Sequence, residues 1–379
     1  MSALADAFGA LPGAVADDGV IFHFGDPMRE QRRLIAGSAV APLGDRSVIE
    51  VAGVDRLSWL DSITSQSVSG LRLGESTELL VLDPQGRVEH AAAVFEDGST
   101  VWLIADAADT EPLATWLTRM VFRSRVTVTV RPDLDVLGFF AGGAAAPAVR
   151  EAAAAPNGTP LVWSDPWAAV QAGGHQYARV ESHPSAEYQW RVAIVEADAA
   201  ASLAGALSAA DLDPAGVLAA EALRIAAWRP RWASEVDERS LPHESDWIRS
   251  AVHLNKGCYR GQETVAKVHN LGHPPRRLAA LHLDGSDDVL PAPGSPVLAG
   301  DDEVGHITSA ARHFEDGPIA LAILSRRAPT GDLIVQADGI DIAAGQQVIV
   351  PADAGATADV PRLTRLSRRP DGQDPRKTQ

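Results

Sequence analysis

The chain has 379 residues, of which 46% are hydrophobic and 22% charged. This length allows two or three globular domains whose core needs neither disulfides nor a structural metal. The formal net charge of −17 disfavours broad binding to phosphate backbones. The single cysteine, Cys258, excludes an intramolecular disulfide and cannot by itself enclose an iron–sulfur cluster, which normally takes four thiolates.

Nothing in the sequence indicates secretion or a membrane segment. Residues 1–18 contain no Lys or Arg, unlike a secretory signal. The longest uncharged run, residues 136–149, is mostly Ala and Gly and too short to span a bilayer. Together with the lone cysteine, this predicts a cytosolic protein that binds neither membranes nor nucleic acid directly.

The first third of the chain alternates strand and helix patterns. Hydrophobic residues at helical spacing predict a helix over 53–69, and Thr110 is the expected cap of a second helix with Pro112 in its first turn. Turn signals at 83–86 and 97–98 indicate an antiparallel meander. Strands are expected at 47–51, 78–82, 87–95, 100–104 and 126–130. This order of elements is typical of an α+β domain.

The middle and last thirds of the chain differ in their predicted secondary structure. Residues 141–160 are rich in Ala, Gly and Pro and predict a loop, followed by a strand at 190–195 and helices at 199–209 and from Asp213-Pro214 to Trp228. Short strands at wide, turn-rich spacing then predict a small β-barrel or sandwich: 278–283, 304–308, 319–324, 333–336 and 347–350. Residues 353–379 are poor in apolar residues and predict a disordered tail.

The least ordinary stretch is Lys256-Gly257-Cys258-Tyr259-Arg260-Gly261-Gln262-Glu263. Its two glycines permit close backbone approach to a ligand, and the residues after Gly261 could begin a helix. A thiol near a helix start and near Lys256 and Arg260 would favour its thiolate form. The simpler interpretation is a glycine turn with a buried cysteine and solvated charges.

The same region reverses the charge of the chain. Between residues 256 and 277 there are five cations and one acid: Lys256, Arg260, Lys267, Arg276 and Arg277 against Glu263. Such a local excess of positive charge would suit an anionic ligand tail, for example the glutamates of a folate.

The eight-residue stretch resembles the K-G-C-Y-x-G-Q-E signature of the YgfZ family, whose superfamily includes the glycine-cleavage T-protein, GcvT. The flanking sequence is similar too. Residues 55–60 with 64–66 resemble the family's N-terminal helix, 223–226 and 241–244 its middle elements, and 305–309 its C-terminal barrel. The resemblance extends over about residues 30 to 350.

The resemblance implies three domains in a ring around a folate-binding channel, with tetrahydrofolate or a derivative as ligand. It divides the chain into a folate-binding region at 1–275, with a separate α+β domain at 47–130 inside it, and a C-terminal β-barrel at 276–352. It implies a chemical role for Cys258 and folate contacts by the other signature residues: Lys256, Gly257, Tyr259, Arg260, Gly261, Gln262 and Glu263.

Two further candidates lie on the helix that ends at Trp228. Arg224 and Trp228 share one helix face with Glu221, and could pair with and stack on a pterin. The alternative is an exposed ion pair beside a half-buried tryptophan. With the resemblance, both become candidate folate contacts. A metal set of His253, Cys258, His269 and His273 matches no common zinc spacing, so no metal site is predicted.

The chain departs from the aminomethyltransferases at two places. Those enzymes carry paired Asp residues where Glu89-His90 stands here, and a Glu where Ala226 stands. The resemblance therefore implies a folate-binding accessory protein for iron–sulfur cluster assembly or repair. Its partners would be iron–sulfur proteins or assembly factors, with effects on cluster enzymes such as those that thiolate tRNA. The alternatives are a folate-dependent aminomethyl or one-carbon transferase using Glu89, and an interaction protein without a ligand.

Overall fold

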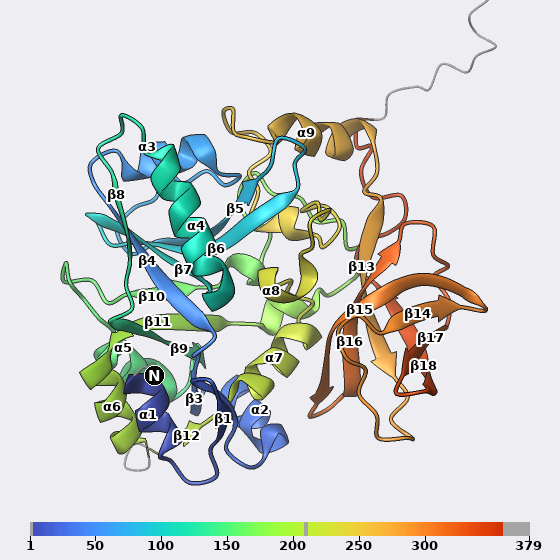
Figure 1. Cartoon of the computed structure of the whole chain (residues 1–379), viewed down its shortest axis with the longest axis horizontal. Helices are drawn as coiled ribbons and strands as arrows, with labels where there is room; N and C mark the ends of the chain where they lie inside the picture. The colour runs from blue at the N-terminus through green and yellow to red at the C-terminus, as the bar shows by residue number, and fades with distance from the viewer. Residues whose placement is uncertain (1–2, 208–210, 359–379) are drawn as a thin grey trace, which may run out of the picture.

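The computed structural model describes residues 3–207 and 211–358 and contains two five-stranded sheets and a closed six-stranded barrel (Figure 1). The predicted α+β chain with a C-terminal β-barrel is confirmed. The sheets lie one above the other on the left of Figure 1 and the barrel lies on the right. In the described part of the chain, no helix is long and apolar enough to cross a bilayer.

The first sheet has the strand order β10-β11-β9-β3-β12, and only the β12–β3 pair is parallel. Its strands are β3 (Ala39–Pro42), β9 (Leu134–Phe140), β10 (Val162–Ser164), β11 (Trp190–Glu196) and β12 (Asp213–Pro214). Helices on its outer face bury a core of their own: α1 (Ala3–Gly9), α5 (Ala145–Ala152) and α6 (Ala197–Ala206). The N-terminal hairpin of β1 (Val15–Asp17) and β2 (Val20–His23) and helix α2 (Pro27–Ile35) complete this part.

The second sheet is antiparallel and is built from consecutive chain, in the order β5-β6-β7-β4-β8. Its strands are β4 (Arg46–Ala52), β5 (Ser76–Leu82), β6 (Val88–Glu96), β7 (Thr100–Asp106) and β8 (Thr127–Val130). The helices α3 (Arg56–Ile63) and α4 (Ala107–Met120) pack on its outer face. The inner faces of both sheets meet in the central core, to which α7 (Val217–Ala226) also contributes.

The barrel closes through β13-β16-β15-β14-β17-β18, so no strand edge stays open. Its strands are β13 (Arg276–Leu283), β14 (Pro296–Ala299), β15 (Asp302–His313), β16 (Gly317–Ser325), β17 (Leu333–Ala337) and β18 (Ile340–Val348). Alternate residues of β13 and β16 fill the barrel or face α7, as the period of two requires. The short helices α8 (Trp232–Glu235) and α9 (Gln262–Leu271) join the sheets to the barrel.

Several predicted boundaries are wrong. The helix expected over 53–69 ends at Ile63, and Ala107, with Asp106 as its N-cap residue, begins the helix for which Thr110 was the expected cap. Part of the loop expected at 141–160 is α5, and Asp213-Pro214 forms β12, with the next helix starting after Gly216. Strand β14 was not predicted, and β18 ends where the strand at 347–350 was expected to begin.

The segment after the barrel returns along α9. The Thr357 amide donates to the His269 carbonyl at 3.0 Å, and Ala354 is buried. Residues 359–379, which make up most of the predicted disordered tail, lie outside the described residues.

Candidate ligand-binding site

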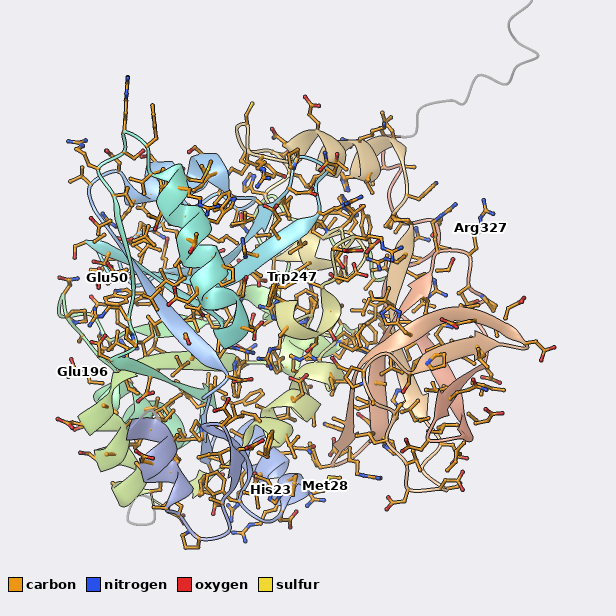
Figure 2. The ribbon with its side chains drawn as sticks, viewed as in Figure 1. His23, Met28, Glu50, Glu196, Trp247 and Arg327 are labelled. Carbon is orange, nitrogen blue, oxygen red and sulfur yellow. The ribbon has the colours of Figure 1, made fainter. Side chains whose placement is uncertain are left out.

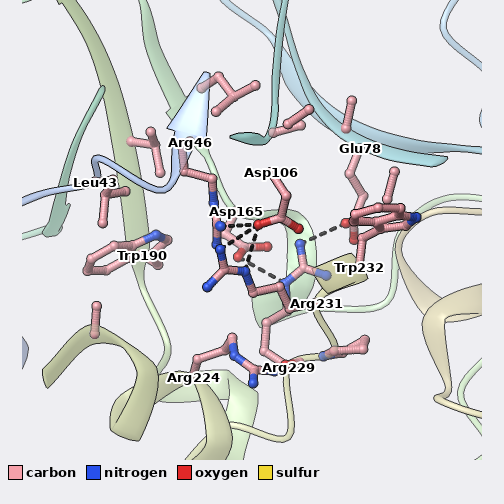
Figure 3. Close-up of a pocket in the computed structure, with 18 of the residues that line it drawn as sticks. Leu43, Arg46, Glu78, Asp106, Asp165, Trp190, Arg224, Arg229, Arg231 and Trp232 are labelled. Atoms are coloured by element: carbon pink, nitrogen blue, oxygen red, sulfur yellow. Dashed lines mark hydrogen bonds and ion pairs between the residues drawn. The ribbon is translucent and has the colours of Figure 1, made fainter. Parts of the chain in front are cut away.

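A cavity of about 130 Å³ lies in the middle of the molecule, between the inner faces of the two sheets and α7 (Figure 3). Five aromatic rings and nine charged side chains are among its lining residues. The rings that line it are Trp163, Tyr188, Trp190, Trp232 and Trp247. Figure 2 shows Trp247 near the centre of the molecule, whereas Glu50, Glu196 and Arg327 lie at its periphery. The flat faces of these rings suit a planar ring system.

One end of the cavity carries a buried arginine between two carboxylates. Arg229 Nη2 donates to Glu78 Oε2 at 2.7 Å, and Arg229 Nε donates to Asp165 Oδ2 at 3.1 Å. The indole Nε1 of Trp247 also donates to Glu78 Oε2, at 3.0 Å. Glu78 shares the inner face of β5 with Leu80 and Leu82, which is why its side chain points into the centre.

This polar group has hydrogen-bonding capacity left over. Glu78 Oε1 and Arg229 Nη1 are buried and have no hydrogen-bond partner among the described residues. Buried polar atoms without partners cost about 1–3 kcal/mol each, so they are normally satisfied by water or a ligand. Burial raises the pKa of Asp165 although Arg229 opposes the shift, and for Arg229 the two carboxylates outweigh burial and raise the pKa.

The other end of the cavity is an ion-pair cluster on three segments. Asp106, at the end of β7, pairs with Arg46 and with Arg231, whose Nη2 also lies 2.7 Å from Asp45 Oδ2. Asp106 Oδ2 also accepts from the Ala233 amide at 3.1 Å, which fixes α8 beside the cavity. Burial raises the pKa of Asp106, with the charge of Arg46 opposing the shift. Figure 3 shows these side chains converging on one wall.

Helix α7 separates this cavity from a second one. Arg224 lines the central cavity, but its guanidinium is already bound by Glu221, Glu235 and Ser309 Oγ, at 2.5, 2.8 and 2.7 Å. Trp228, in contrast, lies outside the central cavity. It lines a cavity of about 540 Å³ between α7 and the barrel and packs edge-on to His183. The structure therefore does not bring together the two predicted helix residues.

The signature segment 256–263 lies beside the β5–β6 hairpin and outside the central cavity lining. Its Lys256 ammonium is enclosed: Nζ donates to the carbonyls of Asp61, Thr64 and Gln66 at 2.5, 2.9 and 2.7 Å. These carbonyls lie in the last turn of α3 and just after it, where unsatisfied acceptors gather. Burial lowers the pKa of Lys256 even though Asp61 opposes the shift. Lys256 therefore anchors the loop, and its three donors are not available to a ligand.

The remaining signature residues hold the loop against the hairpin. Arg260 Nη1 pairs with Glu89 Oε2 at 2.6 Å, and the Glu89 carbonyl accepts from the cavity-lining Trp232 at 2.9 Å. Tyr259 is buried, and Gln262 Nε2 donates to the Lys256 carbonyl at 3.2 Å. Gly261 has φ +83° and lies so close to the hairpin that a Cβ would stand 2.6 Å from the Asp83 carbonyl oxygen. Gly257 and Glu263 are exposed.

Cys258 is exposed at the outer side of this loop, so the interpretation as a small buried cysteine is wrong. Of the five cations in the segment, Arg276 is held by Asp237 and Glu244, and Arg277 is fully buried at the barrel. Only Arg260 and Lys267 remain for an anionic tail. No group of three or more potential metal ligands occurs within residues 3–207 and 211–358.

The two places where the chain departs from the aminomethyltransferases face different ways. Glu89 lies at a β-bulge of β6, outside the central cavity lining, and its carboxylate pairs with Arg260. His90 points to the outer face of the sheet, where its Nδ1 lies 2.6 Å from Asp109 Oδ1 on α4. Ala226 lines the second cavity.

Sequence reasoning missed the polar end of the cavity. Glu78 opens a run of apolar strand residues and shares their inner face, which is an unusual place for an acid and could have indicated a buried partner. Asp165 and Arg229 lie far from Glu78 in the sequence, so no spacing rule connects them. The four cavity tryptophans, Trp163, Trp190, Trp232 and Trp247, were likewise not singled out.

Comparisons with known proteins agree with this architecture. No family model matches the chain. A chloroplastic protein of Arabidopsis thaliana, provisionally assigned as a transferase, is 24% identical over 316 residues, covering 80% of this chain and 69% of its own. An aminomethyltransferase of Stenotrophomonas maltophilia is 24% identical over 319 residues, covering 78% of this chain and 85% of its own.

A solved structure extends the likeness over nearly the whole chain. The aminomethyltransferase T of the glycine cleavage system from Bartonella henselae superposes with a TM-score of 0.69 at 15% sequence identity. It covers 90% of this chain and 94% of its own. At such low identity the match concerns the arrangement of elements, which includes both sheets and the barrel. The chain therefore has the aminomethyltransferase fold.

Proposed function

We propose that the protein binds a reduced folate, tetrahydrofolate or a derivative, with the pterin in the central cavity. The observation that carries the proposal is the buried set of Arg229, Glu78 and Asp165 with unused polar atoms between aromatic walls. A pterin is a flat ring whose edge offers adjacent N–H donors and a carbonyl acceptor. Carboxylates can accept from the donors, Arg229 can donate to the carbonyl, and the tryptophans can stack on the faces.

The anionic end of the folate would lie toward the signature loop. Arg260 is held by Glu89 next to Trp232, and Lys267 is exposed on α9. Both cations are accessible to solvent, so their attraction for a glutamate tail should be screened by salt. Polyglutamylated folates are therefore expected to bind more tightly than monoglutamates, with a difference that shrinks as ionic strength rises.

The wider role that we propose is support of iron–sulfur cluster assembly or repair. The resemblance of residues 256–263 to the YgfZ signature motivates it, and the exposed thiol of Cys258 on an anchored loop is compatible with it. One thiolate cannot hold a cluster alone. Cys258 would act transiently, as a ligand shared with a partner protein or as a nucleophile beside the bound folate.

The test is a calorimetric titration of the purified chain with tetrahydrofolate. We expect micromolar or tighter binding that weakens at least tenfold in Glu78→Gln, because the amide replaces one accepting oxygen with an NH2 donor and removes the charge that pairs with Arg229. Glu196→Gln, an exposed acid at the end of β11, is the matched control and should bind like the unchanged chain. Cys258→Ala should also bind. Absence of heat and of any thermal shift with every folate form would refute the proposal.

A folate-dependent one-carbon transferase is the second candidate, because Glu89 lies next to the central cavity, where its carbonyl accepts from the cavity-lining Trp232 at 2.9 Å. Its carboxylate is engaged in an ion pair with Arg260, which speaks against a free acid or base. We therefore expect no appreciable aminomethyl transfer. Loss of a general acid or base usually costs about 10²–10⁴ in rate. Turnover within tenfold of an authentic T-protein, in the T-protein assay, would favour this second candidate instead.

A further inference from the structure

Two helices of the protein end on an aromatic residue with a left-handed backbone. Trp228 follows α7 with φ +57°, and Phe122 follows α4 with φ +42°. Glycine or asparagine is usual at this position, because a bulky side chain is strained there. Trp228 is only 6% exposed and packs against His183, so burial offsets its strain. Phe122 is 87% exposed and has no such compensation within the described chain.

The strained phenylalanine is also held in place. The Arg125 side chain and amide make three hydrogen bonds of 2.8 to 3.0 Å to the Asp55 carboxylate, which clamps the turn after α4 to the start of α3. The Arg123 guanidinium lies 5.2 Å from the centre of the Phe122 ring. Trp59 Nε1 donates to the Met120 carbonyl at 3.0 Å. The turn that carries the exposed Phe122 ring is thus tied to the start of α3.

Apolar and cationic side chains surround it. Val54, next to the clamp, is 70% exposed, and Met120 is 39% exposed. Arg119 and Arg123 are exposed and have no acidic partner among the described residues. The run 119–125 contains three arginines and no acid in a chain whose net charge is −17. Cations do suit the end of α4, but the helix dipole does not account for an exposed phenylalanine.

We propose that Phe122, Val54 and Met120 form, with Arg119 and Arg123, a docking surface for an acidic partner protein. Phe122 enters an apolar pocket of the partner, and carboxylates around that pocket pair with the two arginines. Aromatic and arginine side chains contribute most at the centres of protein interfaces, and the charge pattern selects an acidic partner. The surface lies on the outer side of the second sheet and is independent of folate binding.

The test replaces Phe122 with the photo-crosslinking residue p-benzoylphenylalanine, which keeps an aromatic ring, in cells that make the full chain. A matched control carries the same residue at Val15, which is also exposed but lies on β1. We expect one protein to crosslink at position 122 and not at 15, through a segment flanked by Asp or Glu. Adding Arg119→Glu and Arg123→Glu should reduce its yield at least tenfold.

The partner is then purified and titrated against the protein. Phe122→Asn should raise Kd at least tenfold while the melting temperature stays equal or rises, because asparagine tolerates a left-handed backbone. Crosslinks only to lipid, to nucleic acid or to a second copy of the chain would overturn the proposal. So would the same partners at both positions, or unchanged affinity of Phe122→Asn. Folate titrations are unaffected by any of these outcomes, so the two proposals are tested separately.

Discussion

Cys258 is held at the surface by a loop whose Lys256, Arg260 and Gln262 side chains are already engaged. Because the thiol contributes little to packing, we expect Cys258→Ser to leave the melting temperature nearly unchanged while cluster-dependent enzymes fail. The measurement is complementation of a strain lacking this protein, with the folded fraction determined in parallel. A Cys258→Ser protein that folds and fully restores those enzymes would contradict the chemical role.

His243 makes stability depend on pH. Burial, with a contribution from nearby His269, lowers the pKa of this imidazole to about 3, and its Nε2 lies 3.1 Å from the Val265 carbonyl. The unfolded chain has the ordinary pKa of about 6.5 and binds more protons between these values, so stability is lost as pH falls from 6.5.

For His243→Gln, the stability difference between pH 6.5 and 5 should shrink by up to about 2 kcal/mol, the linkage expected for one proton. Urea unfolding of both proteins at the two pH values measures it. Other buried groups titrate in both proteins, so the comparison isolates His243. An identical pH dependence would show that His243 is protonated in the folded protein.

The candidate site was predictable only in part. The sequence motif identified the loop 256–263 and its cysteine, because glycines, a thiol and cations occur together in one short segment. Sequence could not show that Lys256 is enclosed by carbonyls of another segment, nor that Arg229 joins Glu78 and Asp165. Such contacts depend on how the sheets meet, which local spacing does not encode.

At the scale of elements, Lys256 fastens the signature loop to the end of α3. Lys256→Met keeps the length of the side chain but leaves three carbonyls without their donor, so we expect the free energy of unfolding to fall by about 1–3 kcal/mol. Lys267→Met, on the exposed face of α9, should change it by less than about 0.5 kcal/mol. Equal effects in urea denaturation would argue against the anchor.

Most strands were predictable and several helix ends were not. Alternation and turn signals located the meander of β5, β6 and β7. Each of these strands has one face toward the central core and the other toward the core beneath α3 and α4. The helix expected to reach Ser69 ends early because Lys256 binds its last carbonyls and Ser65 hydrogen-bonds Leu80. Helix α5 was missed because small residues, Ala145 among them, suffice where it packs closely on the first sheet.

At the scale of the whole molecule, Glu235 joins the sheets to the barrel. Its carboxylate accepts from Arg224 at 2.8 Å and from the barrel residues Thr308, at 3.0 Å, and Ser309. Removing one partner of a buried ion pair typically costs about 3–5 kcal/mol. We expect Glu235→Ala to lose this much and to unfold in two calorimetric steps. Glu221→Ala, whose carboxylate is 26% exposed, should lose less and remain cooperative. A single transition at the original temperature in Glu235→Ala would show that Glu235 does not couple the sheets to the barrel.

In the sequence, the strands of the second sheet are inserted between strands of the first sheet, and this order has a consequence for biosynthesis. β3 is made early, but its neighbours β9 and β12 follow only after the whole of β4 to β8 has been synthesised. The second sheet consists of consecutive chain, so it can form while β3 still waits for partners. All four residues of β3 are buried in the finished protein. We therefore expect nascent chains that stop before residue 134 to expose β3 and to be the ones that chaperones retain.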